Sequence, residues 1–422
     1  MSPRPPPAKS EASNAFLPVD GPSVRHAERG VLRDMRLAIK DVFDVAGYPT
    51  GGGSPVFALE PARSTAPSIA RLLDAGAHFV GKTCLDELAF SLVGTNMHFP
   101  RPRNWAAPMR FTGGSSCGSA AAVGANEADI AIGTDTGGSV RGPASFCGLI
   151  GMRGTHGHIT ARGCVPLAPS FDTVGWFATS FEVYRRVEEV LHCTSDRRCA
   201  NGAANGTGDK GHAARWRPLS CAALDALLPG EAEAREYADR REAVLDTIGG
   251  LVGELDLGLD VDDLYWCFRR LQAIEAWEMH GTFVQRNGAG MNADVRTRFE
   301  WSRNVTPEAF GQALRLRSAF TAWLADELDG DGVLVLPTMP SCAPTLDAGE
   351  TELLDYRERA LHLLCIAGLT GCPQLTLPLG EVNGAPFGIS LIAAHGRDLD
   401  LLRLGELVME RAGAAQSIAP RS

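Results

Sequence analysis

The hydrophobic positions of the chain form short apolar runs that alternate with helical patterns. Residues 37–47 contain an apolar run typical of a buried strand. In residues 67–76, Ile69, Leu72 and Leu73 recur at the spacing of one helix face, and a strand-like run follows at residues 78–81. Strands that alternate with helices predict an α/β architecture.

Three further helices are predicted from the same periodicity. Residues 119–124 are rich in alanine, which allows a helix to pack closely against its neighbours. Residues 231–251 form a charged amphipathic pattern whose core-facing positions are Tyr237, Leu245, Ile248 and Leu251. Residues 262–281 are rich in aromatic side chains and predict a helix that is largely part of the core.

Composition narrows the class of protein. The chain has 422 residues, 45% of them hydrophobic, and a net charge of -10, which argues against nucleic acid or an anionic membrane as the main partner. No stretch approaches the roughly 20 apolar residues of a membrane helix, and the start of the chain lacks the features of a secretory signal. The eleven cysteines show no metal-binding spacing, so we expect reduced thiols, a cytoplasmic location and no cofactor.

Two glycine-framed serine segments carry the chemical signal. They are Thr112-Gly-Gly-Ser-Ser-Cys-Gly-Ser119 and Gly133-Thr-Asp-Thr-Gly-Gly-Ser-Val-Arg-Gly-Pro143. Glycines permit sharp turns and the close approach of a substrate to backbone amides. The second segment therefore predicts an oxyanion hole formed by the amides of Thr136, Gly137, Gly138 and Ser139, with Ser139 as the nucleophile.

A serine nucleophile needs a base. None of the ten histidines has a setting typical of a Ser-His-Asp triad. Lys40 lies in the apolar run 37–47, where burial would lower its pKa and leave a neutral amine that accepts a proton. Lys82 is the rival base. Asp135 and Arg141 are expected to form an ion pair that holds the oxyanion loop in shape.

Lys40 and the two serine segments, with their surroundings, resemble the amidase signature family. The resemblance implies a three-layer α/β/α sandwich with a central mixed sheet and a Ser-cisSer-Lys triad formed by Lys40, Ser115 and Ser139, in which the Gly114–Ser115 peptide bond is cis. It also implies the proton relay. Ser139 attacks the acyl carbon, Ser115 passes the proton towards Lys40, and water later cleaves the acyl-enzyme.

We expect residues 1–25 to form a flexible tip and residues 26–422 a single amidase domain, with residues 195–300 as a variable region around the substrate pocket. The expected substrate-binding residues are Ala89, Gly113, Gly114, Trp277 and Phe283, and Ser116 is expected to support the site with Asp135 and Arg141. A homodimer is an open alternative to a monomer. The expected partner is a small-molecule amide.

Three sequence segments indicate the substrate, because they resemble those of short indole-3-acetamide hydrolases. They are Ile39–Gly47, Arg153–Gly157 and Ser170–Ala178. They predict hydrolysis of a small aryl or alkyl primary amide to a carboxylate and ammonia. Three alternatives stay open. They are an amidotransferase A subunit that generates ammonia from glutamine, a ureide or biuret amidohydrolase, and a catalytically silent scaffold.

Two other motifs receive structural interpretations. The His156-Gly-His158 pair lacks a third metal ligand at a sensible spacing, so a structural role is expected. Cys117, next to the serine loop, is interpreted as a small packing residue rather than a redox site.

Overall fold

A computed structural model describes residues 12–57, 60–192 and 216–418. Within these residues ten strands form one sheet in the order β2-β1-β3-β5-β4-β9-β10-β8-β6-β7. The strands are β1 (Arg36–Lys40), β2 (His78–Thr83), β3 (Ile130–Asp135), β4 (Ile150–Arg153), β5 (Thr173–Ala178), β6 (Arg217–Ser220), β7 (Gly253–Glu254), β8 (Gly332–Pro337), β9 (Gln374–Val382) and β10 (Ala385–Ala393).

The sheet is mixed, as the resemblance implied. β1 runs parallel to β2 and β3, and β6 runs parallel to β7 and β8 at the other edge. Between these two groups the pairs β3–β5, β5–β4, β4–β9, β9–β10 and β10–β8 are antiparallel. Side chains alternate between the two faces of each strand. In β1, Leu37 and Ile39 join one hydrophobic cluster and Ala38 joins another on the opposite face.

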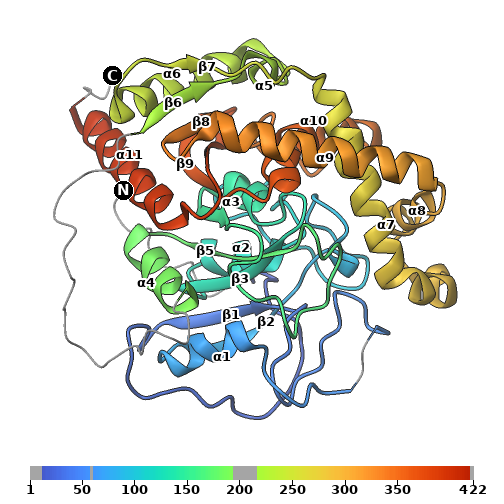
Figure 1. Cartoon of the computed structure of the whole chain (residues 1–422). Coiled ribbons are helices and arrows are strands. Elements are labelled where there is room, and N and C mark those ends of the chain that lie inside the picture. Colours follow the sequence, from blue (N-terminus) through green and yellow to red (C-terminus); the bar gives the residue numbers. More distant parts are fainter. Residues whose placement is uncertain (1–11, 58–59, 193–215, 419–422) are drawn as a thin grey trace.

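Four helices cover the face that Leu37 and Ile39 contact. Their buried side chains share one hydrophobic cluster with those of the strands, so this layer and the sheet form one core. In Figure 1, α4 and α11 lie side by side along the strands. The four helices are α1 (Pro67–Asp74), α4 (Phe181–His192), α6 (Glu231–Ile248) and α11 (Asp398–Ile418).

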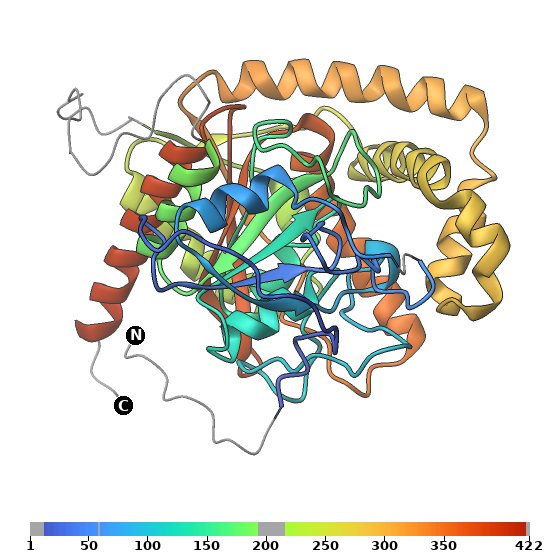
Figure 2. The same ribbon diagram turned by 90° about the horizontal axis from the view of Figure 1, so that it is seen from below.

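The opposite face is covered by α2 (Cys117–Gly124), α3 (Arg141–Cys147) and α10 (Glu350–Thr370). The alanines of α2 let it lie directly against β1, β3 and β5. Outside α10 lie α7 (Val261–Asn287), α8 (Ala293–Ser302) and α9 (Pro307–Leu328), which extend beyond the sheet (Figure 2). The result is the predicted three-layer α/β/α sandwich.

Two expectations from the sequence need correction. Residues 13–19 do not behave as a free tip, because Ala15 and Leu17 are buried and this segment runs beside β2 with Leu17 N donating to Lys82 O at 2.9 Å. Residues 1–11 lie outside the described residues. Leu251 does not face the core: α6 ends at Ile248, and Leu251 is 93% exposed.

The predicted variable region 195–300 is described only from residue 216 onwards, where it forms β6, α6, α7 and most of α8. A short helix, α5 (Ala222–Asp225), packs against β8. Among the described helices, none combines the length and apolar character that crossing a membrane requires.

Candidate active site

The first serine segment forms a tight loop that leads into α2. Its Gly114–Ser115 peptide bond is cis, as the resemblance implied, and Gly113 adopts a positive φ of 76°. A Cβ atom at Gly114 would lie 2.1 Å from Asp86 Oδ2, so only glycine fits there. Ser116 contacts the neighbouring strand, with its Oγ 3.2 Å from Thr134 O. The loop is thereby held against β3.

Lys40 ends β1 and reaches the serine loop. Its side chain is fully buried, and Nζ donates to Ser115 Oγ and to Thr134 Oγ1, both at 2.8 Å. Burial lowers the pKa of Lys40 to about 8, although Cys164 and other groups oppose the shift. Its two hydrogen-bond partners are neutral hydroxyls. A substantial neutral fraction of Lys40 is therefore available near physiological pH.

Lys82, the rival base, is also fully buried but points to other partners. Its Nζ lies 3.0 Å from Asp41 Oδ1 and donates to Phe43 O at 2.5 Å. The carboxylate of Asp41 is thus a counter-charge in direct contact with Lys82. Lys82 thus has the surroundings of a structural ion pair, and neither serine segment contributes a hydrogen bond to it.

Ser139 follows the second pair of glycines at the start of α3. Its carbonyl oxygen accepts a hydrogen bond from Ser116 N at 3.3 Å, which joins the two serine segments. Within the described residues, the amides of Thr136, Gly137 and Ser139 have no hydrogen-bond partner. The prediction for Gly138 is wrong, because its amide donates to Asp135 Oδ1 at 3.0 Å. Three of the four expected oxyanion donors are thus free to bind a ligand.

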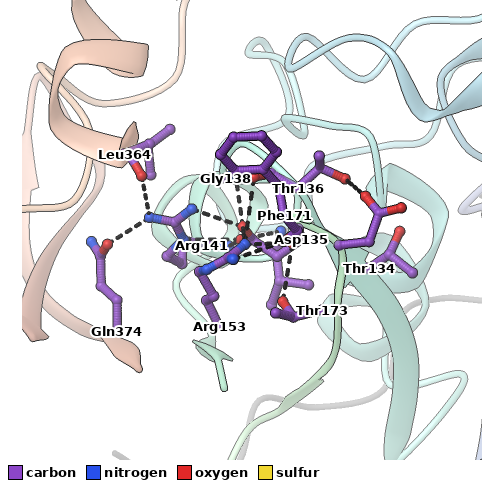
Figure 3. Close-up of polar contacts among 12 residues, drawn as sticks. Thr134, Asp135, Thr136, Gly138, Arg141, Arg153, Phe171, Thr173, Leu364 and Gln374 are labelled. Carbon is purple, nitrogen blue, oxygen red and sulfur yellow. Dashed lines mark hydrogen bonds and ion pairs between the residues drawn. The ribbon is translucent and has the colours of Figure 1, made fainter. Parts of the chain in front are cut away.

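The carboxylate of Asp135 holds the oxyanion loop in place by accepting hydrogen bonds from its backbone amides. Figure 3 shows Arg141 and Arg153 converging on it, with Arg141 Nη2 at 2.7 Å and Arg153 Nη1 at 3.3 Å from Oδ1. The expected ion pair with Arg141 is therefore present, and sequence reasoning missed Arg153. Burial alone would raise the pKa of Asp135, but the two guanidinium groups hold it well below its usual range. The carboxylate stays charged and fixes the loop through the amides of Gly138 and Val140.

A small, partly open cavity of about 20 Å³ lies beside Ser139. Its wall comes from five parts of the chain: the end of the short 3₁₀ helix η1 (Glu87–Ala89) with the segment after it, the oxyanion loop, the connection between β4 and β5, α7 and α10. The lining residues are Ala89, Phe90, Ser91, Leu92, Thr136, Gly137, Ser139, Leu167, Gln272, Arg357 and Leu361. The predicted nucleophile Ser139 thus lines the same small cavity as Thr136 and Gly137, whose amides are free.

The comparisons with known proteins agree with this geometry. The family model described as Amidase matches residues 19–205. Amidase 1 from Oryza sativa subsp. japonica is 34% identical over 395 residues, which cover 89% of this chain and 90% of that protein. The chain belongs to the amidase signature family. Membership confirms the fold and the enzyme class, an amidase, that the sequence predicted.

Two further relatives of this amidase differ in their descriptions. A structure titled "Crystal structure of amidase" superposes with a TM-score of 0.79 at 30% identity and covers 91% of this chain and 86% of that chain. Translocon at the outer membrane of chloroplasts 64 from Pisum sativum is 34% identical over 388 residues, covering 88% of this chain and 65% of that protein. The family likeness thus spans most of the chain in both cases.

The predicted substrate-binding residues of this amidase divide into two groups. Ala89 lines the Ser139 cavity. Gly113 and Gly114 do not, and their role is to shape the cis loop. Trp277 and Phe283 do not line the cavity either. They pack against the apolar cluster that contains Phe299, Phe90 and Leu167.

Two residues that line the Ser139 cavity of the amidase were not predicted from the sequence. Gln272 lies in α7 and Arg357 in α10, 85 positions apart along the chain. A helix was predicted over residues 262–281 but none over the region of α10, and nothing in a helix pattern distinguishes a buried polar residue that faces a cavity from one at the surface. A charged residue inside the buried stretch of α10 was the one available signal.

A possible metal-ligand cluster lies away from the cavity. His158, His192 and Asp398 offer ligand atoms that all lie within 4.8 Å of one another, so the structure supplies the third group that sequence spacing did not reveal. His158 Nδ1 is 3.6 Å from Asp398 Oδ2, and His192 Nε2 is 2.9 Å from Glu188 Oε1. These contacts also describe two ion pairs. His156 is not part of the cluster and contacts Pro169 O at 3.0 Å.

Proposed function

We propose that this amidase hydrolyses a small primary amide to a carboxylate and ammonia, with Ser139 as nucleophile, Ser115 as proton relay and Lys40 as base. The observation that carries the proposal is the buried hydrogen bond of 2.8 Å between Lys40 Nζ and Ser115 Oγ. The next residue, Ser116, donates its backbone N–H to Ser139 O. Burial of Lys40 supports its use as a base, because the charged form is disfavoured there.

The proposed reaction has two stages, acylation of Ser139 and hydrolysis of the acyl-enzyme. Ser139 Oγ attacks the amide carbon while its proton passes to Ser115 Oγ and the proton of Ser115 passes to neutral Lys40. The amides of Gly137 and Ser139 stabilise the oxyanion. The C–N bond then breaks, and the same path returns the proton to the leaving nitrogen, which departs as ammonia. A water molecule then attacks the acyl carbon while its proton passes through Ser115 to Lys40. The proton returns to Ser139 Oγ as the ester bond breaks and the carboxylate leaves.

The acyl group is proposed to be small, since only a small cavity lies beside Ser139. Phe90, Leu92 and Leu361 give its wall an apolar part, which supports an aryl or alkyl group such as that of indole-3-acetamide. We also propose a cytoplasmic location. All nine cysteines in the described residues are free thiols, which suits a reducing compartment.

A catalytically silent scaffold is the competing proposal. The likeness to Translocon at the outer membrane of chloroplasts 64 favours it, whereas the retention of Lys40, Ser115 and Ser139 opposes it because a scaffold does not need these groups. The two proposals differ in one readily measured property, the reactivity of Ser139.

The test measures ammonia release from indole-3-acetamide, phenylacetamide, glutamine and biuret, together with labelling by a fluorophosphonate probe. We expect release from the aryl amides and labelling of Ser139, with the Ser139→Ala variant losing roughly 10⁴-fold or more in kcat. Ser318→Ala is the control, because this serine lies on α9 and donates only to Leu314 O.

The outcomes separate the alternatives. Preference for glutamine would support an amidotransferase subunit, and preference for biuret a ureide hydrolase. Labelling or ammonia release that persists in Ser139→Ala would contradict the assigned nucleophile. Absence of both in the wild-type protein would favour the scaffold.

A further inference from the structure

Arg357 is the unusual residue of the cavity wall. It lies on α10, its side chain is 6% exposed, and it lines the same cavity as Ser139. Within the described residues it forms no hydrogen bond and no ion pair, and its Nε is buried without a partner. A guanidinium group carries five N–H donors and a permanent charge. Arg357 thus brings an unsatisfied cation into the cavity.

Other buried arginines of the protein show how such a charge is normally held. Arg141 and Arg153 are fully buried, and both contact the carboxylate of Asp135. A buried charge without a counter-charge is strongly unfavourable, so it is normally paired and hydrogen-bonded. Arg357 is an exception that a bound anion would remove.

The surroundings of Arg357 reinforce its positive potential. Burial disfavours the charged guanidinium and lowers its pKa well below the ordinary value, and the positive charges of Arg298 and Arg269 act in the same direction, so an anion bound beside Arg357 would offset both effects. Tyr265 and Glu358 act in the opposite direction with smaller effect. The cavity end at Arg357 therefore favours a negatively charged ligand group over a neutral one.

A second polar group, Gln272, lines the same cavity. Gln272 is buried on α7 and, among the described residues, its side chain has no hydrogen-bond partner. A Cβ atom on Gly137 would lie 3.4 Å from Gln272 Nε2, so this amide group stands next to the expected oxyanion donors. The cavity thus offers neutral donors near Ser139 and a cation at Arg357.

We propose that Arg357 binds a carboxylate on the acyl part of the substrate, which makes the substrate a half-amide of a short dicarboxylic acid. This inference rests on the proposed function, since the amide end must react at Ser139. The planar guanidinium donates two parallel hydrogen bonds to a carboxylate, which fixes the acyl chain as well as neutralising the charge. The neutral aryl or alkyl group expected from the sequence leaves Arg357 unpaired.

Binding is tested first, without turnover. In the Ser139→Ala background, calorimetry compares succinamate with butyramide, a neutral amide of the same chain length. We expect succinamate to bind roughly 100-fold more tightly, and Arg357→Met to remove that difference. Arg357→Lys keeps the charge but loses the paired donors, so it should retain part of the preference. Equal binding of the two amides would overturn the inference.

Hydrolysis is then measured in the wild-type protein and in Arg357→Met. We expect kcat/KM for succinamate relative to that for butyramide to fall by roughly 100-fold in the variant. Arg269→Met is the control, because Arg269 acts on Arg357 through its charge but does not line the cavity. It should preserve the preference for succinamate.

The two proposals fail in different ways. Hydrolysis of phenylacetamide and butyramide with no preference for succinamate would overturn the role of Arg357 and leave the proposed amidase reaction intact. Tight, Arg357-dependent binding of succinamate without ammonia release from any amide would contradict the proposed reaction and leave the carboxylate site standing.

Discussion

Lys40 and Lys82 lie on neighbouring parallel strands, and both side chains are fully buried. Lys82 is 3.0 Å from the carboxylate of Asp41, whereas Lys40 contacts only the hydroxyls of Ser115 and Thr134. One lysine is therefore held as half of an ion pair, and the other is left without a directly bonded anion. The difference shows that burial alone does not make a base, because the partner decides whether the amine can lose its proton.

The largest expected effect is on catalysis. Lys40→Met removes the proposed base, so kcat should fall by roughly 10³-fold or more, which ammonia release measures directly. The unfolding midpoint should stay near that of the wild-type protein or rise, because the change removes a buried cation with no carboxylate partner. A variant that retains more than a tenth of the wild-type kcat would contradict the assignment of Lys40.

The next effect is on stability. Lys82→Met leaves Asp41 buried and unpaired, so the free energy of unfolding should fall by about 3 kcal/mol in a denaturant titration. The folded fraction should keep a kcat near the wild-type value. Adding Asp41→Asn should restore much of the lost stability, since the unpaired charge is then gone. Loss of kcat without loss of stability would identify Lys82 as the base instead.

The smallest effect is on the pH profile. Lys40 must be neutral to accept a proton, and its pKa in the free enzyme is about 8, so kcat/KM should fall about tenfold per pH unit below this value and level off above it. Thr134→Val removes an acceptor that favours the charged amine, which should move this limb to lower pH by roughly half a unit. A kcat/KM that declines above pH 7 would contradict a lysine base.

The sequence was sufficient for the parts of the site that are contiguous in the chain. The Gly-Gly-Ser segments and the apolar strand that ends at Lys40 are local patterns that carried the resemblance to the amidase signature family, and that resemblance implied the cis bond at Ser115 and the pairing of Lys40 with Ser115. The oxyanion loop was also local, but the use of the Gly138 amide by Asp135 was not foreseeable. A carboxylate and an oxyanion compete for the same donors, and sequence does not show which one is closer.

The substrate wall could not be predicted in the same way. Gln272 and Arg357 come from two helices that meet only in the folded molecule, so no spacing rule relates them. Trp277 and Phe283 were chosen because they are aromatic and near in sequence to the expected pocket. In the structure they stabilise the packing of α7 behind the wall. Aromatic residues serve cores and pockets equally well, so composition alone did not separate the two uses.

The segment 13–19 has a consequence for the chemical durability of the enzyme. Leu17 packs against Cys84 and Cys117, and burial raises the pKa of Cys117 well above its ordinary value. A thiol that is both covered and protonated reacts slowly with peroxides, because the thiolate is the reactive form. This stretch of chain therefore shields from oxidation the first residue of α2, which directly follows the serine loop.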